Sequence, residues 1–212
     1  MTRRPTPRLA PGAVHVWIAA SASRGRAKPP GRVLTQVLAR YLPAGAAPRI
    51  RRGALGRPSL REGGGLDFNV AHTDGRVLIA LTRGARIGVD VERLRRVPAC
   101  LALAGEVFGA GTAHALARVA EPRRSARFLA LWTLLEAAVK AEGADVSQSF
   151  ARFRQAVLAA GEGRPAGTPD LRPIRAGRGY CAAVALSRPI SSIRIFRAGG
   201  AAAGPKQEKR RR

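Results

Sequence analysis

The sequence is poor in several residue types, and each shortage excludes a class of protein. Two cysteines, Cys100 and Cys181, are too few for a disulfide scaffold or a zinc ribbon. No stretch approaches the ~18 consecutive apolar residues of a membrane-spanning helix, so no membrane partner is expected. Aromatic residues make up 5% of the chain, few for stacking on bases. We therefore expect a protein of a reducing, cytoplasmic compartment.

Positive charge, by contrast, is abundant. The chain has 38 Lys+Arg against 13 Asp+Glu, a net charge of +25, and since four of the 38 are lysines, 34 are arginines. The arginines are scattered along the whole chain, and their planar side chains suit bidentate contact with phosphate. An anionic partner is expected. Charge alone does not choose among nucleic acid, a phosphorylated small molecule and an acidic protein.

Hydrophobic patterning indicates a mixed α+β chain of 212 residues, enough for one large domain or two small ones. We expect a loose basic leader at 1–12, two halves at 13–95 and 96–198, and a disordered basic tail at 199–212. Residues 44–66 and 161–173 are expected to be irregular. Strands are predicted at 14–19, 68–71, 76–82, 87–91, 180–186 and 192–197; helices are predicted at 32–42, at 98–120 with a break near 109–111, and at 122–141.

One internal similarity concerns four of these strands. The segments 77–81 and 87–91 are expected to form a strand pair across a tight turn, and so are 181–186 and 192–196. Two similar α+β halves would explain this repetition. A coincidence between two ordinary hairpins would explain it equally well.

Two acidic residues, Asp90 and Glu92, are separated by one valine in the run Ile87-Gly-Val-Asp-Val-Glu92. Because alternate residues of a strand share a face, Asp90 and Glu92 should point the same way. Two close carboxylates repel unless a cation lies between them, and Mg²⁺ takes oxygen ligands of this kind. The alternative is a solvent-facing strand end whose acids pair with nearby arginines.

A second candidate group lies on the helix predicted at 122–141. Glu136 and Lys140 are four residues apart and share one helical face, while Trp132 belongs to the core-facing stripe. Glu136 could be a third metal-site acid or a general base, with Lys140 reaching a phosphate. An ordinary surface ion pair is the alternative.

Two further residues could contact an anion. His72 closes a short strand before the turn Thr73-Asp-Gly75, where it could donate to a phosphate or cap the turn. Arg57 lies between glycine and proline in a turn that should display it outward, either to bind phosphate or to remain solvated.

In order, these motifs resemble the 4′-phosphopantetheinyl transferases of the surfactin type. That family carries Gly-Lys-Pro, Phe-Asn-(Ile/Val)-Ser-His-Ser, Ile-Gly-(Val/Ile)-Asp-(Ile/Val)-Glu and Trp-x-x-Lys-Glu-(Ala/Ser)-x-x-Lys-x-x-Gly. The corresponding segments here are Gly56-Arg57-Pro58, Phe68-Asn-Val-Ala-His72, Ile87-Gly-Val-Asp-Val-Glu92 and Trp132-x-x-x-Glu136-x-x-x-Lys140, with Gly143 as the last glycine.

The resemblance implies a fold and a reaction. The fold would be a pseudo-dimer of two similar α+β halves in a monomeric chain. The enzyme would transfer the 4′-phosphopantetheine arm of coenzyme A to a serine of an acyl or peptidyl carrier protein, with Mg²⁺, or Mn²⁺ as the alternative ion, and release 3′,5′-ADP.

The resemblance also implies residue roles. Asp90, Glu92 and Glu136 would hold the metal against the coenzyme A pyrophosphate, and Glu136 would be the base for the serine hydroxyl. Lys140 would neutralise charge on the pyrophosphate. His72 and Arg57 would contact coenzyme A phosphates; the candidates for the 3′-phosphate are Arg24, Arg26 and Lys28.

Four departures from the family pattern keep other functions open. Leu135 stands where the family has lysine, Arg57 replaces the lysine of Gly-Lys-Pro, and Ala71 replaces the serine before His72. Thr112 falls where the family usually has glutamate. A Leu135→Lys substitution is expected to preserve or raise activity. The alternatives are a degenerate transferase relative with weak activity, a basic nucleic-acid-binding protein and a Mg²⁺-dependent nuclease, of which the nucleic-acid partner is disfavoured by the acidic strand.

Overall fold

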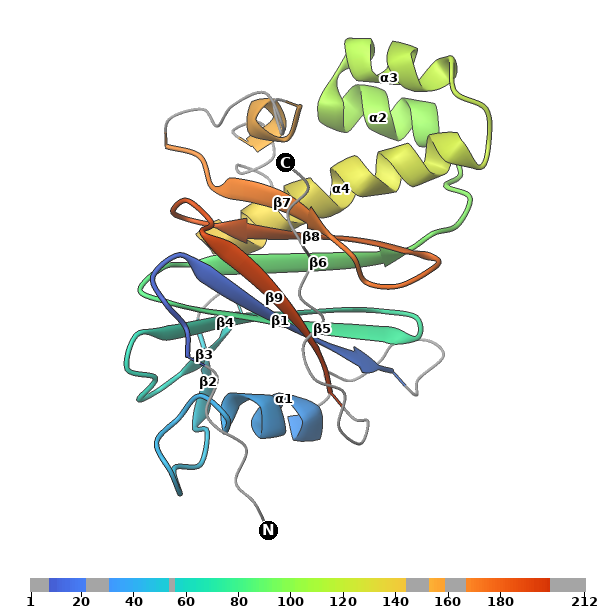
Figure 1. Cartoon of the computed structure of the whole chain (residues 1–212). Helices are drawn as coiled ribbons and strands as arrows, with labels where there is room; N and C mark the ends of the chain where they lie inside the picture. The colour runs from blue at the N-terminus through green and yellow to red at the C-terminus, as the bar shows by residue number, and fades with distance from the viewer. Residues whose placement is uncertain (1–7, 22–30, 54–55, 144–152, 159–166, 199–212) are drawn as a thin grey trace.

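A computed structural model describes residues 8–21, 31–53, 56–143, 153–158 and 167–198 (Figure 1). Three predicted phosphate contacts, Arg24, Arg26 and Lys28, lie outside the described residues, as do the tail at 199–212 and most of the leader. None of the described helices combines the length and apolar character needed to cross a bilayer.

The first sheet has four strands in the order β4-β5-β1-β9. Neighbours are antiparallel except that β9 runs parallel to β1. One face packs against α1 (Gly31–Leu38) in a cluster that includes Trp17, Leu38 and Ile79. The strands are β1 (Ala13–Ala20), β4 (Leu66–Thr73), β5 (Arg76–Arg83) and β9 (Ser192–Arg197).

The second sheet has three antiparallel strands in the order β6-β8-β7. They are β6 (Ile87–Arg93), β7 (Asp170–Ile174) and β8 (Tyr180–Leu186). The long helix α4 (Arg123–Glu142) lies on its outer face, beneath α2 (Cys100–Phe108) and α3 (Ala110–Ala117) (Figure 1). The inner faces of the two sheets share a core that includes Val16, Leu78, Val89 and Val184.

The predicted hairpins are wrong. The strands β5 and β6 belong to different sheets, and so do β8 and β9. In each pair the chain passes from one sheet to the other. The alternating apolar pattern of these strands is the same as in a hairpin, because every strand has one face in the core between the sheets. The orders β4-β5-β1 and β7-β8-β6 correspond strand for strand.

Most of the predicted elements are confirmed, and with them the mixed α+β class. The predicted division at residue 95 leaves β6 before it and β9 after it, although each pairs with strands from the other side; the division itself stays a prediction. The helix predicted at 32–42 ends at Leu38. The regions expected to be irregular contain β2 (Ile50–Arg52), β3 (Pro58–Leu60) and β7, which are short and rich in arginine and proline.

Candidate active site

A glycine lets the helix α4 approach the strand β6 closely. A Cβ atom built on Gly88 would lie 1.9 Å from the carbonyl oxygen of Ala137 and 2.5 Å from the backbone nitrogen of Ala141. No side chain fits there, so the backbones of β6 and α4 are in direct contact. This contact brings the acids of β6 within reach of the polar face of α4.

The acids of β6 and the lysine of α4 meet as the sequence predicts. Ile87, Val89 and Val91 face the core between the sheets, so Asp90 and Glu92 face α4. Asp90 is 7% exposed, and its Oδ1 lies 2.6 Å from Nζ of Lys140. The same Nζ lies 3.8 Å from Oε2 of Glu136. The second oxygen of Asp90, Oδ2, is buried without a hydrogen-bond partner among the described residues.

Burial and mutual repulsion raise the pKa of two of the acids. Burial, and after it the charge of Asp90, raises the pKa of Glu92 above its ordinary value, against a smaller lowering by Arg95. Burial raises the pKa of Glu136, and Lys140 opposes this shift while Asp90 adds to it. The three carboxylates therefore repel one another, and a cation of higher charge would relieve that repulsion.

The donor set agrees with a magnesium ion in its chemistry. In the described part of the chain, no three Asp, Glu, His or Cys side chains stand as a ready-made metal site. The carboxylates of Asp90, Glu92 and Glu136 nevertheless supply hard oxygen donors, and Oδ2 of Asp90 is already buried and unpartnered. Such an oxygen is costly unless a ligand takes it up. The alternative of arginine pairing applies to Glu92, whose Oε2 lies 3.8 Å from Nη2 of Arg95.

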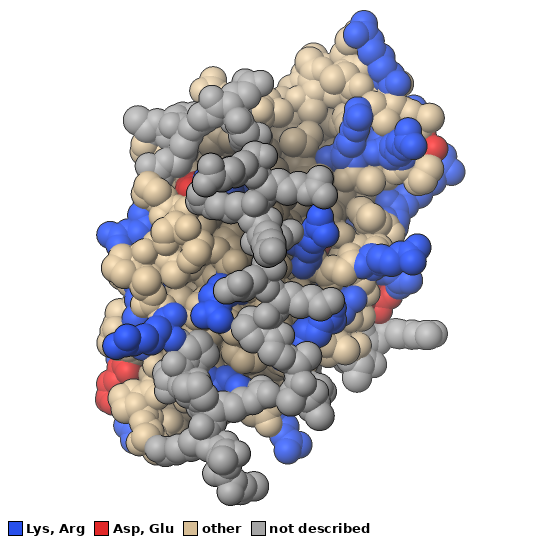
Figure 2. All heavy atoms as spheres, in the orientation of Figure 1, with Lys and Arg blue, Asp and Glu red and all other residues tan. Residues whose placement is uncertain are grey.

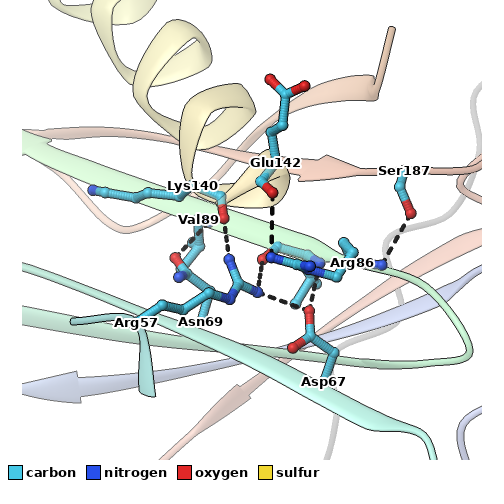
Figure 3. A network of polar contacts seen from close by, with 9 residues as sticks. Arg57, Asp67, Asn69, Arg86, Val89, Lys140, Glu142 and Ser187 are labelled. Atoms are coloured by element: carbon cyan, nitrogen blue, oxygen red, sulfur yellow. Dashed lines mark hydrogen bonds and ion pairs between the residues drawn. The ribbon is translucent and has the colours of Figure 1, made fainter. Parts of the chain in front are cut away.

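Arg57 is not displayed outward, as the sequence suggested. Its side chain is 15% exposed and turns into the molecule (Figure 3). Nη2 donates to Oδ2 of Asp67 at 2.7 Å and to the carbonyl oxygen of Ile87 at 2.8 Å, while Nη1 donates to the carbonyl oxygen of Lys140. Burial lowers the pKa of Arg57, and the charge of Asp67 opposes that shift. The turn prediction failed because polar acceptors inside the fold are not visible in a local motif.

His72 lies near the end of β4, as predicted, and is exposed. It shares a strand face with Phe68, on the α1 side of the sheet, whereas Ala71 faces the core between the sheets. A role in binding phosphate therefore stays a prediction.

Leu135 does not lie at the polar face of α4. Its side chain is 0% exposed and belongs to the core between α4 and the second sheet. A lysine at this position would bury its charge, so we no longer expect Leu135→Lys to be harmless. Trp132 is partly buried against the same core and stacks on Phe128, as the helical stripe predicted.

Two residues that support the site escaped the sequence analysis. Oδ2 of Asp67 accepts the backbone N–H of Ile87 at 2.8 Å, and Oδ1 of Asn69 accepts that of Val89 at 3.0 Å. These side chains of β4 fasten the edge of β6 in place of a neighbouring strand's backbone. Their spacing of two within an otherwise apolar strand was the available signal, because buried polar side chains need partners.

Comparisons with known proteins agree with this geometry. Residues 86–185 match the model of the 4′-phosphopantetheinyl transferase superfamily. The chain is 34% identical over 102 residues to the 4′-phosphopantetheinyl transferase AcpT of Salmonella typhi, covering 48% of this chain and 53% of AcpT. It is 30% identical over 98 residues to the 4′-phosphopantetheinyl transferase psf-1 of Bacillus pumilus, covering 46% of this chain and 41% of psf-1. The match thus spans about half the length of these relatives or less. The segment that carries β6, α4 and β8 is thus similar to the 4′-phosphopantetheinyl transferase superfamily.

Proposed function

We propose that this protein is a 4′-phosphopantetheinyl transferase. It moves the phosphopantetheine arm of coenzyme A to a serine of an acyl or peptidyl carrier protein and releases 3′,5′-ADP. The observation that carries the proposal is the group formed by Asp90, Glu136 and Lys140, with Oδ2 of Asp90 buried and unpartnered within the described structure. The family match over residues 86–185 supports it independently.

Each residue of the site has a separate role in this reaction. Asp90, Glu92 and Glu136 would hold Mg²⁺, or Mn²⁺ in its place, which when bound stabilises negative charge on the pyrophosphate. Glu136 takes the proton of the serine hydroxyl as the serine oxygen bonds to the phosphorus and the bond between that phosphorus and the leaving 3′,5′-ADP breaks. Lys140 offsets the charge of the departing 3′,5′-ADP. For His72 we propose a contact to a coenzyme A phosphate.

We propose further that the fold is a pseudo-dimer in a monomeric chain. The matching strand orders support this, and so does a repeated contact. Asp67 accepts the N–H of Ile87 at 2.8 Å, and Asp170 accepts the N–H of Ile190 at 2.8 Å, each pair 20 residues apart. Both contacts hold the chain where it crosses between the sheets, which is what an internal duplication produces.

The surface charge suits an acidic protein partner. Lys and Arg side chains are spread over several elements of the face in Figure 2, where few acids are visible. With a net charge of +25, attraction to an acidic carrier protein would speed encounter and weaken with salt. A cytoplasmic site of action is part of the same proposal.

The test is the intact mass of an apo carrier protein after incubation with this chain, coenzyme A and Mg²⁺. We expect a gain of one phosphopantetheine group that is lost with EDTA and with Asp90→Ala. Glu62→Ala is the matched control, because it removes an exposed acid between β3 and β4, and it should retain transfer. If folded protein modifies none of several carrier proteins, or if Asp90→Ala stays fully active, the proposal is wrong. Binding or cleavage of nucleic acid would then favour the alternatives.

A further inference from the structure

We propose that Arg57 is a positioning residue that holds Lys140 and the strand carrying Asp90 in register, rather than a phosphate ligand. The inference rests on the proposed function for the role of Lys140 itself. It is carried by the contacts that Arg57 makes, which link three separate parts of the fold (Figure 3).

The first link is to the helix. Nη1 of Arg57 donates to the backbone carbonyl oxygen of Lys140, in the last turn of α4. The last four carbonyl groups of a helix have no partner within the helix, and the C-terminal end of a helix attracts positive charge. Nη2 of Arg86 donates to a second of these carbonyl oxygens, that of Glu142, at 3.2 Å. Two guanidinium groups therefore fix the end of α4 from which the Lys140 side chain extends.

The second link is to the strand. Oδ2 of Asp67 accepts the N–H of Ile87 at 2.8 Å, and Nη2 of Arg57 donates to the carbonyl oxygen of Ile87 at 2.8 Å. Arg57 and Asp67 are themselves 2.7 Å apart, so the pair binds both polar groups of one residue of β6. Asp90 follows three residues later on the same strand. A single partly buried side chain thus anchors both partners of the 2.6 Å contact between Lys140 and Asp90.

The geometry explains why arginine is needed here. The two terminal nitrogens of the planar guanidinium reach separate acceptors, a carbonyl oxygen of α4 from Nη1 and a carboxylate and a carbonyl oxygen from Nη2. Lysine would keep the charge, but its three donors diverge from one nitrogen and would not reach both groups of acceptors in the same way. A phosphate ligand, by contrast, would need its donors open to the substrate, and Arg57 has a side chain that is 15% exposed.

Steady-state kinetics separate the two roles, with coenzyme A and an apo carrier protein as substrates. We expect Arg57→Lys and Asp67→Asn each to lower kcat about 10- to 100-fold, with KM for coenzyme A changed less than about twofold, because a displacement near 1 Å costs rates of that size. Arg83→Lys is the matched control: Arg83 donates to the carbonyl oxygens of Gly64 at 2.7 Å and Tyr41 at 2.8 Å, away from α4, and should keep its kcat. A raised KM with unchanged kcat in Arg57→Lys would overturn the proposal, as would an equal loss of kcat in Arg83→Lys.

A second readout does not depend on transferase activity. The chain has four lysines, so ¹³C-lysine labelling gives a simple NMR spectrum in which Lys140 is assigned by its loss in Lys140→Arg. We expect Asp67→Asn to shift the Lys140 signal. Asp170→Asn is the control, because the Asp170 carboxylate makes the equivalent contact to Ile190 and pairs with Arg172 rather than with an arginine that binds α4. An unmoved Lys140 signal in Asp67→Asn would overturn the positioning role, whereas an inactive wild type with a shifted signal would overturn only the transferase.

Discussion

The contact between Gly88 and α4 makes the most direct prediction. In Gly88→Ala the new methyl carbon would lie 1.9 Å from the carbonyl oxygen of Ala137. Ordinary contact begins at 3.4 Å, so the helix must retreat by about 1.5 Å from β6. Because both obstacles, Ala137 O and Ala141 N, are backbone atoms, no side-chain rotation relieves the clash.

This retreat has a cost in stability and a cost in activity. Overpacking of this kind costs about 1–3 kcal/mol, and we expect the upper end, which lowers Tm by about 6–12 °C in a chain of this size. The 2.6 Å contact between Lys140 and Asp90 would lengthen beyond hydrogen-bonding distance. We expect transfer to slow about 100-fold.

Thermal unfolding and initial transfer rates measure both effects. Gly105→Ala, inside α2, is the matched control, because a Cβ there would make an ordinary 3.7 Å contact with the side chain of Ala113 in α3. It should gain about 0.5–1 kcal/mol, as alanine favours a helix over glycine. If Gly88→Ala unfolds within 2 °C of the wild type and transfers within twofold of its rate, α4 does not depend on this glycine and the reasoning is refuted.

Three further predictions concern stability. Asn69→Ala leaves the buried N–H of Val89 unpaired and should cost about 1–3 kcal/mol in urea unfolding; an unchanged midpoint would show that β6 does not need this contact. Burial, aided by the charge of Arg194, lowers the pKa of His15 from 6.5 to about 4. Since the unfolded state then binds a proton that the native state refuses, up to about 3 kcal/mol should be lost as pH falls from 6.5 to 4, and His15→Gln should remove that part of the slope. Leu135→Lys should cost about 3–5 kcal/mol against less than about 1.5 for Leu135→Met, and equal costs would contradict the burial of this position.

Local patterns predicted the elements and the polar face of the site well. Asp90 and Glu92 share a strand face, and Glu136 and Lys140 share a helix face, because the periods of strand and helix alone dictate this. Their meeting in space also depended on Gly88, whose meaning is visible only when the partner helix is known.

Contacts between distant parts of the chain could not be predicted. The inward turn of Arg57 depends on acceptors in β4, β6 and α4, which no local motif contains. The prediction that β5 and β6 form a hairpin failed for a similar reason. A strand with one face in a core shared by two sheets has the same alternation whichever sheet it joins.

The parallel pairing of β1 with β9 also affects how the chain folds during synthesis. Val14 lies opposite Ile193, so the two edges that meet are separated by most of the sequence. Until β9 has left the ribosome, β1 is an edge strand with an apolar run from Val16 to Ala19. A nascent or truncated chain without β9 would present this edge to other molecules. Pairing with β9 therefore protects β1 from aggregation only late in synthesis. Before β9 is synthesised, chaperone binding would be expected at β1.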